Sequence, residues 1–248
     1  MFAPDVIEAI KGHAIAEYPH ESVGVITADG YLPLPNIAVD PDGKAPPEAY
    51  RRHFFLAGGN FQQLLISGAV KALVHSHPDG PEWPSIPDQL QQRAMGVPWG
   101  LLMCNHEVAS EPYFWGDMFD PPPLLGRDFR FGPSGTDGRG DCGALVRDWY
   151  RIERNTLLPD CARDDIWFKR GENLYIDHYK RAGFAPADID HAEVGDVALM
   201  QIRSDVPNHA AVFVGNGLIM HHLEGRLSRI EPLGQWRKYI VGWMRHAV

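Results

Sequence analysis

The sequence predicts a two-domain protein whose first domain, residues 1–120, is an α/β layered unit. Predicted strands and helices alternate along this part of the chain, which is the pattern of a sheet covered by helices. Three prolines follow at 121–123, and consecutive prolines disfavour helix and form a stiff, extended spacer. We therefore place a linker at 121–125 and a second domain at 126–248.

The elements of the first domain are predicted from apolar spacing and from turn residues. Helices are predicted at 6–14 and 61–68, where apolar residues recur every three or four positions. A third helix is predicted at 89–94, after a strand and a proline-rich loop. Strands are predicted where short apolar runs lie between turn residues: at 24–27, 31–34, 70–74, 99–104 and 113–115. Residues 40–52 and 78–87 are rich in proline and are predicted as loops.

Composition and charge exclude several classes of protein. The 248 residues are 44% hydrophobic and 22% charged, which is typical of a globular chain. A net charge of −9 argues against nucleic acid as a main partner, because such binding depends on a basic surface. No apolar run approaches the roughly 18 residues of a membrane span. The first residues lack the basic and apolar regions of a signal peptide, so we expect synthesis in the cytoplasm.

His75 and His77, followed after seven residues by Ser85 and Asp88, form the pattern of a metal site. Alternate residues of a strand point to the same face, so the two histidines can reach one ion. Imidazoles and a carboxylate suit Zn2+, and three protein ligands leave a fourth position for water, as in catalytic sites. Ser85 and Asp88 also match a helix capping box, and the two interpretations are compatible.

This pattern resembles the JAB/MPN (JAMM) metallopeptidase family, whose motif is an upstream glutamate, H-x-H, seven residues and S-x-x-D. Glu21 matches the glutamate. The resemblance implies that His75, His77 and Asp88 hold zinc, that Glu21 is the general acid/base, and that Ser85 steadies the oxyanion. The alternative for Glu21 is a solvated surface carboxylate, the commonest environment of glutamate.

Cys142 begins a second candidate site. Cys104, Cys142 and Cys161 are too few and odd in number for a disulfide framework, so at least one thiol is free within the chain. A predicted helix places Cys142 in its first turn, after Asp141 as N-cap, where the helix dipole stabilises a thiolate. The alternative is a small buried apolar side chain, the usual environment of a free cysteine.

Two predicted strands further along the chain carry histidines. His209 starts one strand, the pair His221 and His222 ends the next, and Asn-Gly between the strands predicts a hairpin. One histidine can be the base for Cys142 while another orients that base. An odd loop puts His221 on the face of His209 and an even loop puts His222 there, which patterning leaves open. The other member of the pair is expected at an exposed strand end.

Together these residues resemble the NlpC/P60 family of papain-like cysteine peptidases, which has Asp-Cys near a helix start and a histidine at the start of a later strand. The resemblance implies an α+β, papain-like second domain with Cys142 as nucleophile, His209 as base and His221, twelve residues later, as the third residue. Gly143 stands where the family often has serine, and no tyrosine precedes Asp141. Those positions tune rate and specificity. The family usually cleaves bacterial cell-wall stem peptides.

A JAB/MPN domain followed by an NlpC/P60 domain resembles phage tail-tip assembly proteins of the lambda K type, particularly over residues 141–150 and 208–228. The resemblance implies a two-domain hydrolase in the tail tip of a phage or related particle. Its partners would be peptidoglycan stem peptides and other tail-tip proteins, and the substrate of its zinc domain is left open. Two alternatives are a structural tail-tip component with idle sites and a cytoplasmic isopeptidase that acts on protein conjugates.

Overall fold

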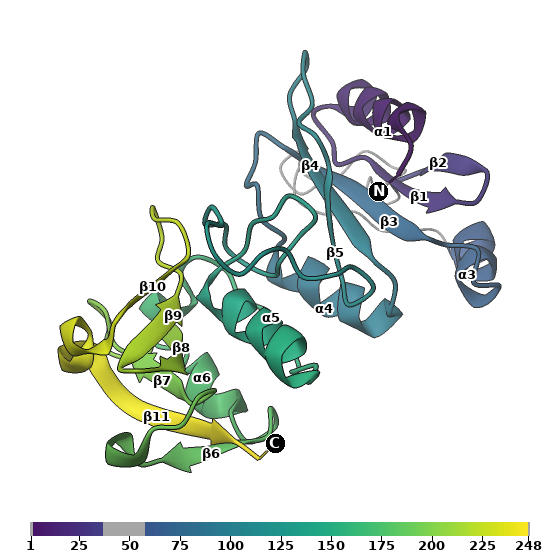
Figure 1. Ribbon diagram of the computed structural model, residues 1–248. Helices are drawn as coiled ribbons and strands as arrows, with labels where there is room; N and C mark the ends of the chain where they lie inside the picture. The colour runs from purple at the N-terminus through teal and green to yellow at the C-terminus, as the bar shows by residue number, and fades with distance from the viewer. Residues whose placement is uncertain (1, 37–57, 248) are drawn as a thin grey trace. The chain divides into compact units, whose positions relative to one another are not determined.

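The computed structural model describes residues 2–36 and 58–247 and divides into two compact units, Met1–Phe119 and Asp120–Val248 (Figure 1). Each unit has its own sheet and its own apolar clusters. The predicted loop at 40–52 lies outside the described residues. Within the described ranges, every helix is too short or too polar to cross a membrane.

A mixed five-stranded sheet forms the centre of the first unit, in the order β2-β1-β3-β4-β5. The pair β3–β4 is parallel, and the other described neighbours are antiparallel. The strands are β1 (Val23–Thr27), β2 (Gly30–Leu34), β3 (Ala72–Pro78), β4 (Trp99–Cys104) and β5 (Tyr113–Trp115). The helices are α1 (Pro4–Glu17), α3 (Gly58–Ile66) and α4 (Ile86–Met95).

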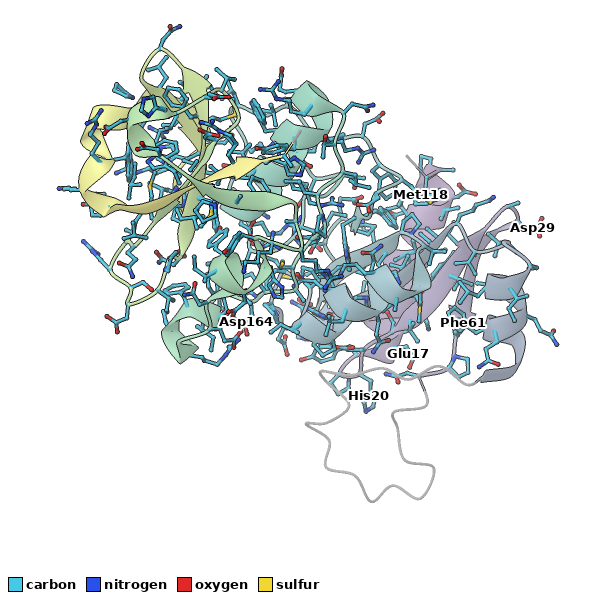
Figure 2. The ribbon with its side chains drawn as sticks, turned by 90° about the horizontal axis from the view of Figure 1, so that it is seen from below. Glu17, His20, Asp29, Phe61, Met118 and Asp164 are labelled. Carbon is cyan, nitrogen blue, oxygen red and sulfur yellow. The ribbon has the colours of Figure 1, made fainter. Side chains whose placement is uncertain are left out.

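Helices cover both faces of this sheet, which is the α/β layering that the sequence predicts. Ile10 of α1 packs with Val74 and Phe114 on one face. Phe61 of α3, labelled in Figure 2, packs with Trp99 and with other strand residues on the opposite face. Buried residues of the strands alternate between the two clusters, because successive side chains of a strand point to opposite faces.

A six-stranded antiparallel sheet forms the second unit, in the order β10-β9-β8-β7-β11-β6. The strands are β6 (Phe184–Ala187), β7 (Val197–Met200), β8 (His209–Gly215), β9 (Leu218–His221), β10 (Arg229–Pro232) and β11 (Ile240–His246). The helical elements are α5 (Cys142–Arg154), η1 (Trp167–Arg170), α6 (Leu174–His178), η2 (Ile189–His191), η3 (Leu233–Gln235) and η4 (Arg237–Tyr239).

Helix α5 packs on one face of the second sheet through Leu145 and Trp149, which share a cluster with Val212 and Met244. The opposite face buries a separate cluster that includes Trp243 and Leu233 of η3. An antiparallel sheet with its long helix on one face is an α+β arrangement. It brings the first residue of α5 to the sheet that carries the three candidate histidines.

The proline segment predicted as a linker is attached to the second unit. The guanidinium of Arg127 donates hydrogen bonds to the carbonyl oxygens of Pro122 and Pro123, and it also donates to Asp148 of α5 at 2.7 Å. Arg127 and Asp148 are both buried. Arg127 therefore links the carbonyl groups of Pro122 and Pro123 to Asp148 of α5.

Candidate active sites

His75, His77 and Asp88 meet at one end of strand β3. The histidines are alternate residues of β3, and Asp88 lies in the first turn of α4. Nε2 of each imidazole is 3.5 Å from Oδ2 of Asp88. One ligand atom from each residue lies within 4.8 Å of the others, and all three residues are buried. This donor set fits Zn2+, which binds imidazole nitrogen and carboxylate oxygen.

Hydrogen bonds orient two members of this group. Nδ1 of His77 is 2.8 Å from the carbonyl oxygen of Pro81, so Nδ1 is the donor and Nε2 keeps its lone pair for the ion. The backbone N–H and the hydroxyl of Ser85 both donate to Oδ2 of Asp88 at 2.7 Å. Ser85 is thus the N-cap of α4 in a complete capping box. Its role at an oxyanion stays a prediction, because the hydroxyl here binds Asp88.

Glu21 is buried, unlike the solvated carboxylate considered as its alternative. Its Oε1 is 3.9 Å from Nε2 of His77. Burial and the nearby Asp88 raise the pKa of Glu21 to about 9. In contrast, the two imidazoles together hold the pKa of Asp88 well below its usual range, although burial opposes this. The site therefore joins an ionised ligand to a carboxyl group that can carry a proton.

Cys142 begins α5, and its sulfur lies at the start of β8. Sγ is 3.3 Å from the hydroxyl of Tyr175 on α6, and the backbone N–H of Ala210 also donates to it. Burial raises the pKa of the thiol, Asp141 adds to this effect, and the contacts with Tyr175 and Ala210 oppose it. Burial therefore opposes the thiolate that the helix start is predicted to stabilise.

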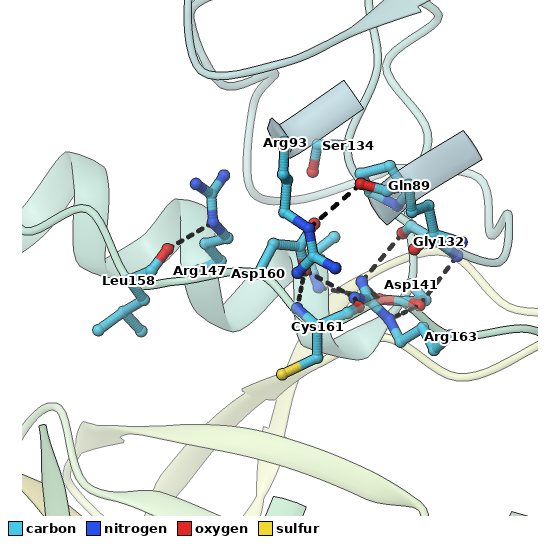
Figure 3. A network of polar contacts seen from close by, with 12 residues as sticks. Gln89, Arg93, Gly132, Ser134, Asp141, Arg147, Leu158, Asp160, Cys161 and Arg163 are labelled. Carbon is cyan, nitrogen blue, oxygen red and sulfur yellow. Dashed lines mark hydrogen bonds and ion pairs between the residues drawn. The ribbon is translucent and has the colours of Figure 1, made fainter. Parts of the chain in front are cut away.

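A buried ion pair holds the residue before the nucleophile (Figure 3). Nε and Nη2 of Arg163 donate to the two carboxylate oxygens of Asp141 at 2.6 and 2.8 Å. Asp141 also accepts hydrogen bonds from the backbone N–H groups of Gly132 and Ala144. Nη1 of Arg163 binds Asp160 at 2.7 Å. Because Asp141 is the N-cap of α5, this network fixes the helix start that carries the sulfur.

His209 and His221 face each other on neighbouring strands, and a hydrogen-bonded chain leads from them to the carboxylate of Glu231. Nε2 of His209 is 3.1 Å from Nδ1 of His221, and Nε2 of His221 is 3.1 Å from Oε2 of Glu231. Trp236 donates to the same oxygen at 2.9 Å. Because an ionised carboxylate only accepts, His221 donates from Nε2 and accepts at Nδ1. His209 is then the donor at Nε2, which leaves the lone pair of its Nδ1 available for a proton.

The hairpin that carries these histidines contains a β-bulge. Its turn has two residues, since Gly215 pairs with Leu218. The next pair is Phe213 with Ile219, so β8 contains an extra residue, Val214.

The bulge decides between His221 and His222. A two-residue turn with an uninterrupted ladder would place His222 opposite Ala211, on the face of His209. The extra residue shifts the pairing by one position, so His221 lies opposite Ala211. The loop is even, but the bulge reverses its effect on the register.

His222 differs from the predicted exposed strand end, because it is fully buried. Its ring lies 5.1 Å from the ring of Phe129, which comes from the loop before α5. Burial lowers the pKa of His222 to about 4.

Sequence reasoning missed two side chains of this site, Tyr175 and Glu231. Glu231 pairs with Ile219 across β9 and β10, which places it on the face of His221. Tyr175 reaches the sulfur from a short helix 33 residues along the chain. Neither residue belongs to a local pattern, so only the sheet register and the packing of α6 identify them.

A cavity of about 160 Å³ adjoins Cys142. Apolar and aromatic side chains of α5, η1, α6 and the sheet form most of its wall, among them Val146, Trp167, Tyr175 and Leu199. Asp141, Asp160 and Arg163 also line it.

Comparison with known proteins identifies the family. Residues 126–245 match the NlpC/P60 family. The chain is 31% identical to Tail tip assembly protein K of Escherichia phage N15 over 247 residues, which cover 97% of this chain and 93% of that protein. The chain belongs to the tail tip assembly protein K family. Tail tip assembly protein K of Escherichia phage lambda is 34% identical over 187 residues, covering 74% of this chain and 85% of that protein.

Among solved structures, NlpC1 from Trichomonas vaginalis is similar with 19% identity and a TM-score of 0.34, covering 49% of this chain and 39% of that one. The part of this chain that matches the NlpC/P60 family includes Cys142, His209 and His221. Their catalytic roles stay predictions, as does the JAB/MPN assignment of residues 1–120.

Proposed function

We propose that this protein is a component of the tail tip of a phage or related particle and that Cys142 cleaves peptide bonds of peptidoglycan. Its relatives are named as tail tip assembly proteins, which also makes other tail proteins its expected partners. The NlpC/P60 match implies a cysteine peptidase. Two observations carry the proposal: the Cys142 sulfur lies at Ala210, the residue after His209, and His209 is linked through His221 to Glu231.

His209 would take the proton of the thiol as the sulfur attacks the carbonyl carbon of the scissile amide. Burial, with His221 adding to it, lowers the pKa of His209 to about 3, so the imidazole is neutral in the resting protein. The tetrahedral intermediate collapses to a thioester as His209 protonates the leaving amine. Water, deprotonated by His209, then hydrolyses the thioester and restores the thiol. His221 and Glu231 would hold the imidazole in the required tautomer.

We also propose a zinc-dependent peptidase or isopeptidase site in a JAB/MPN-like first domain. His75, His77 and Asp88 would hold Zn2+, which supplies a water of lowered pKa and polarises a carbonyl group when bound. Glu21 would serve as the general acid/base of the reaction. Its burial within 3.9 Å of His77 supports this role.

Digestion of purified peptidoglycan by the wild type, Cys142→Ala and His77→Ala, with mass analysis of the products, tests the assignment. We expect Cys142→Ala to abolish stem-peptide cleavage, and His77→Ala or a chelator to leave it intact. Loss of cleavage on chelation alone would assign the activity to the first unit. A wild type with neither bound zinc nor thiol reactivity at Cys142 would support a purely structural tail component.

A further inference from the structure

The mechanism proposed above assigns no ligand to the cavity beside Cys142. This cavity has a volume of about 160 Å³ and is partly open to solvent. An apolar cavity of about 150 Å³ stays dry and accepts benzene. The void is therefore large enough for one ring-sized apolar group.

The cavity wall favours an apolar occupant over a charged one. Trp167 and Tyr175, whose rings are 5.8 Å apart, line it together with Leu158, Tyr179 and Phe184. The charged lining residues are Asp141, Asp160, Arg147 and Arg163, and Arg163 binds both carboxylates. Two carboxylates and two guanidinium groups leave the wall without net charge, whereas an apolar group would gain contacts with its aromatic side chains.

The position of the cavity connects it with the reacting sulfur. Cys142 itself lines the cavity, and the hydroxyl of Tyr175 lies 3.3 Å from Sγ. Ala210, whose backbone N–H donates to the same sulfur, is a third lining residue. A group seated in the cavity is therefore next to any bond that the sulfur attacks.

We propose that this cavity binds an apolar side chain of the peptide substrate, aromatic or branched aliphatic, next to the bond that Cys142 attacks. The inference rests on the proposed role of Cys142 as nucleophile. It extends the substrates from cell-wall stem peptides to polypeptides with a bulky apolar residue beside the cleaved bond.

Alkylation of Cys142 in the full chain tests the cavity without a substrate. Iodoacetamide and N-benzyl-iodoacetamide have the same reactive iodomethylene group, and only the second carries an aromatic ring. We expect the benzyl reagent to modify Cys142 at least about tenfold faster, relative to iodoacetamide, than it modifies glutathione in the same solution. Mass analysis of the peptide that contains Cys142 separates its rate from those of Cys104 and Cys161.

Two matched variants locate the effect. Ala182 lines the cavity, whereas Ala185 is exposed on β6. We expect Ala182→Phe to fill the cavity and to reduce the benzyl preference to that of glutathione. Ala185→Phe should keep the preference of the wild type. The comparison of reagents on the wild type alone remains decisive if Ala182→Phe does not fold.

Equal preferences at Cys142 and glutathione would overturn the proposal. An N-dodecyl reagent that reacts faster than the benzyl reagent would also overturn it, because the cavity would then accept a long acyl chain. Failure of the proposed function gives a different result. If the protein keeps the benzyl preference but releases no stem peptides, the apolar site is supported and peptidoglycan is excluded as the substrate.

Discussion

Cys142 and His209 are both neutral in the resting protein, because burial acts on them in opposite directions. It raises the pKa of the thiol and lowers the pKa of the imidazole to about 3. The charged pair therefore forms only when the proton moves from sulfur to nitrogen during attack. Tyr175 and the Ala210 N–H are the groups placed to stabilise the sulfur once it is anionic.

Replacing Tyr175 with phenylalanine tests this stabilisation at the sulfur. We expect Tyr175→Phe to lower kcat/KM for peptide cleavage about tenfold, the loss of one hydrogen bond to a charged group. The pH at which the rate of Cys142 alkylation reaches half its maximum should rise by about one unit. Tyr239→Phe, the same change outside the cavity, should match the wild type. A Tyr175→Phe profile identical to the wild type would exclude the hydrogen bond from catalysis.

Buried histidines make the second unit sensitive to acid. The folded-state pKa of His222 is about 4, below its ordinary value of 6.5. The unfolded chain therefore binds the proton first, and the free energy of unfolding falls as the pH drops from about 6.5 toward 4. We expect a loss on the order of 1 kcal/mol per pH unit from His222. His209, with a folded-state pKa of about 3, acts in the same direction.

Urea unfolding at pH 7.0 and 5.5 measures this effect. His222→Asn should reduce the difference between the two free energies of unfolding, whereas His191→Asn, at an exposed site, should leave it unchanged. Undiminished acid sensitivity in His222→Asn would assign the effect to other groups.

Two local features of the elements position the side chains of the two sites. The capping box at the start of α4 turns Asp88 toward the histidines of β3. The bulge at Val214 turns His221 toward His209. Each feature changes which side chain reaches the site while leaving the strand or helix in place.

Deleting Val214 should exchange the two neighbouring histidines. The uninterrupted ladder would put His222 on the face of His209 and take His221 away from Glu231. We expect peptide cleavage to fall at least about a hundredfold, with an unchanged far-ultraviolet circular dichroism spectrum. Deleting Glu224, which is exposed after β9, should preserve the register and the activity. Full activity without Val214 would show that the bulge does not select His221.

Ser85→Ala removes the cap of α4. We expect it to lower the free energy of unfolding by about 1 kcal/mol and to weaken Zn2+ binding roughly tenfold, because Asp88 loses a hydrogen bond that orients it. Competitive zinc titration and thermal unfolding measure the two effects. Ser67→Ala, at the exposed end of α3, is the matched control. Unchanged zinc affinity would mean that the cap only stabilises the helix.

At the scale of the whole molecule, the described residues form two sheets with separate apolar cores, so each candidate site has its own supporting structure. The zinc ligands lie on elements of the first core, and Cys142 and its histidines lie on elements of the second. We therefore expect two transitions in calorimetric unfolding of the full chain.

Zinc should stabilise only one of these transitions. At a free concentration 100 times its Kd, a bound ion adds about 2.7 kcal/mol to the unit that holds it. His77→Ala should remove that shift, whereas Cys142→Ala should retain it. A single transition that zinc moves as a whole would show that the two units unfold together.

Most secondary structure could be predicted from local spacing, but the detail of the second site could not. Predicted strands at 24–27, 31–34, 99–104 and 113–115 lie within observed strands or coincide with them. His75 and His77 share a face because a strand repeats every two residues. Glu231 reaches His221 only after a third strand pairs with β9, and no local pattern carries that information.

The sequence by itself determined the chemistry available: a His-His-Asp set suited to zinc, and a cysteine at a helix start with histidines on a later hairpin. These features depend on residue type and on short-range periodicity, which neighbouring residues specify. Only the tertiary structure decided that His221 serves His209, that the resting thiol is neutral, and that an apolar cavity adjoins the sulfur. These depend on a bulge, on burial and on packing, which arise from contacts between residues far apart in the chain.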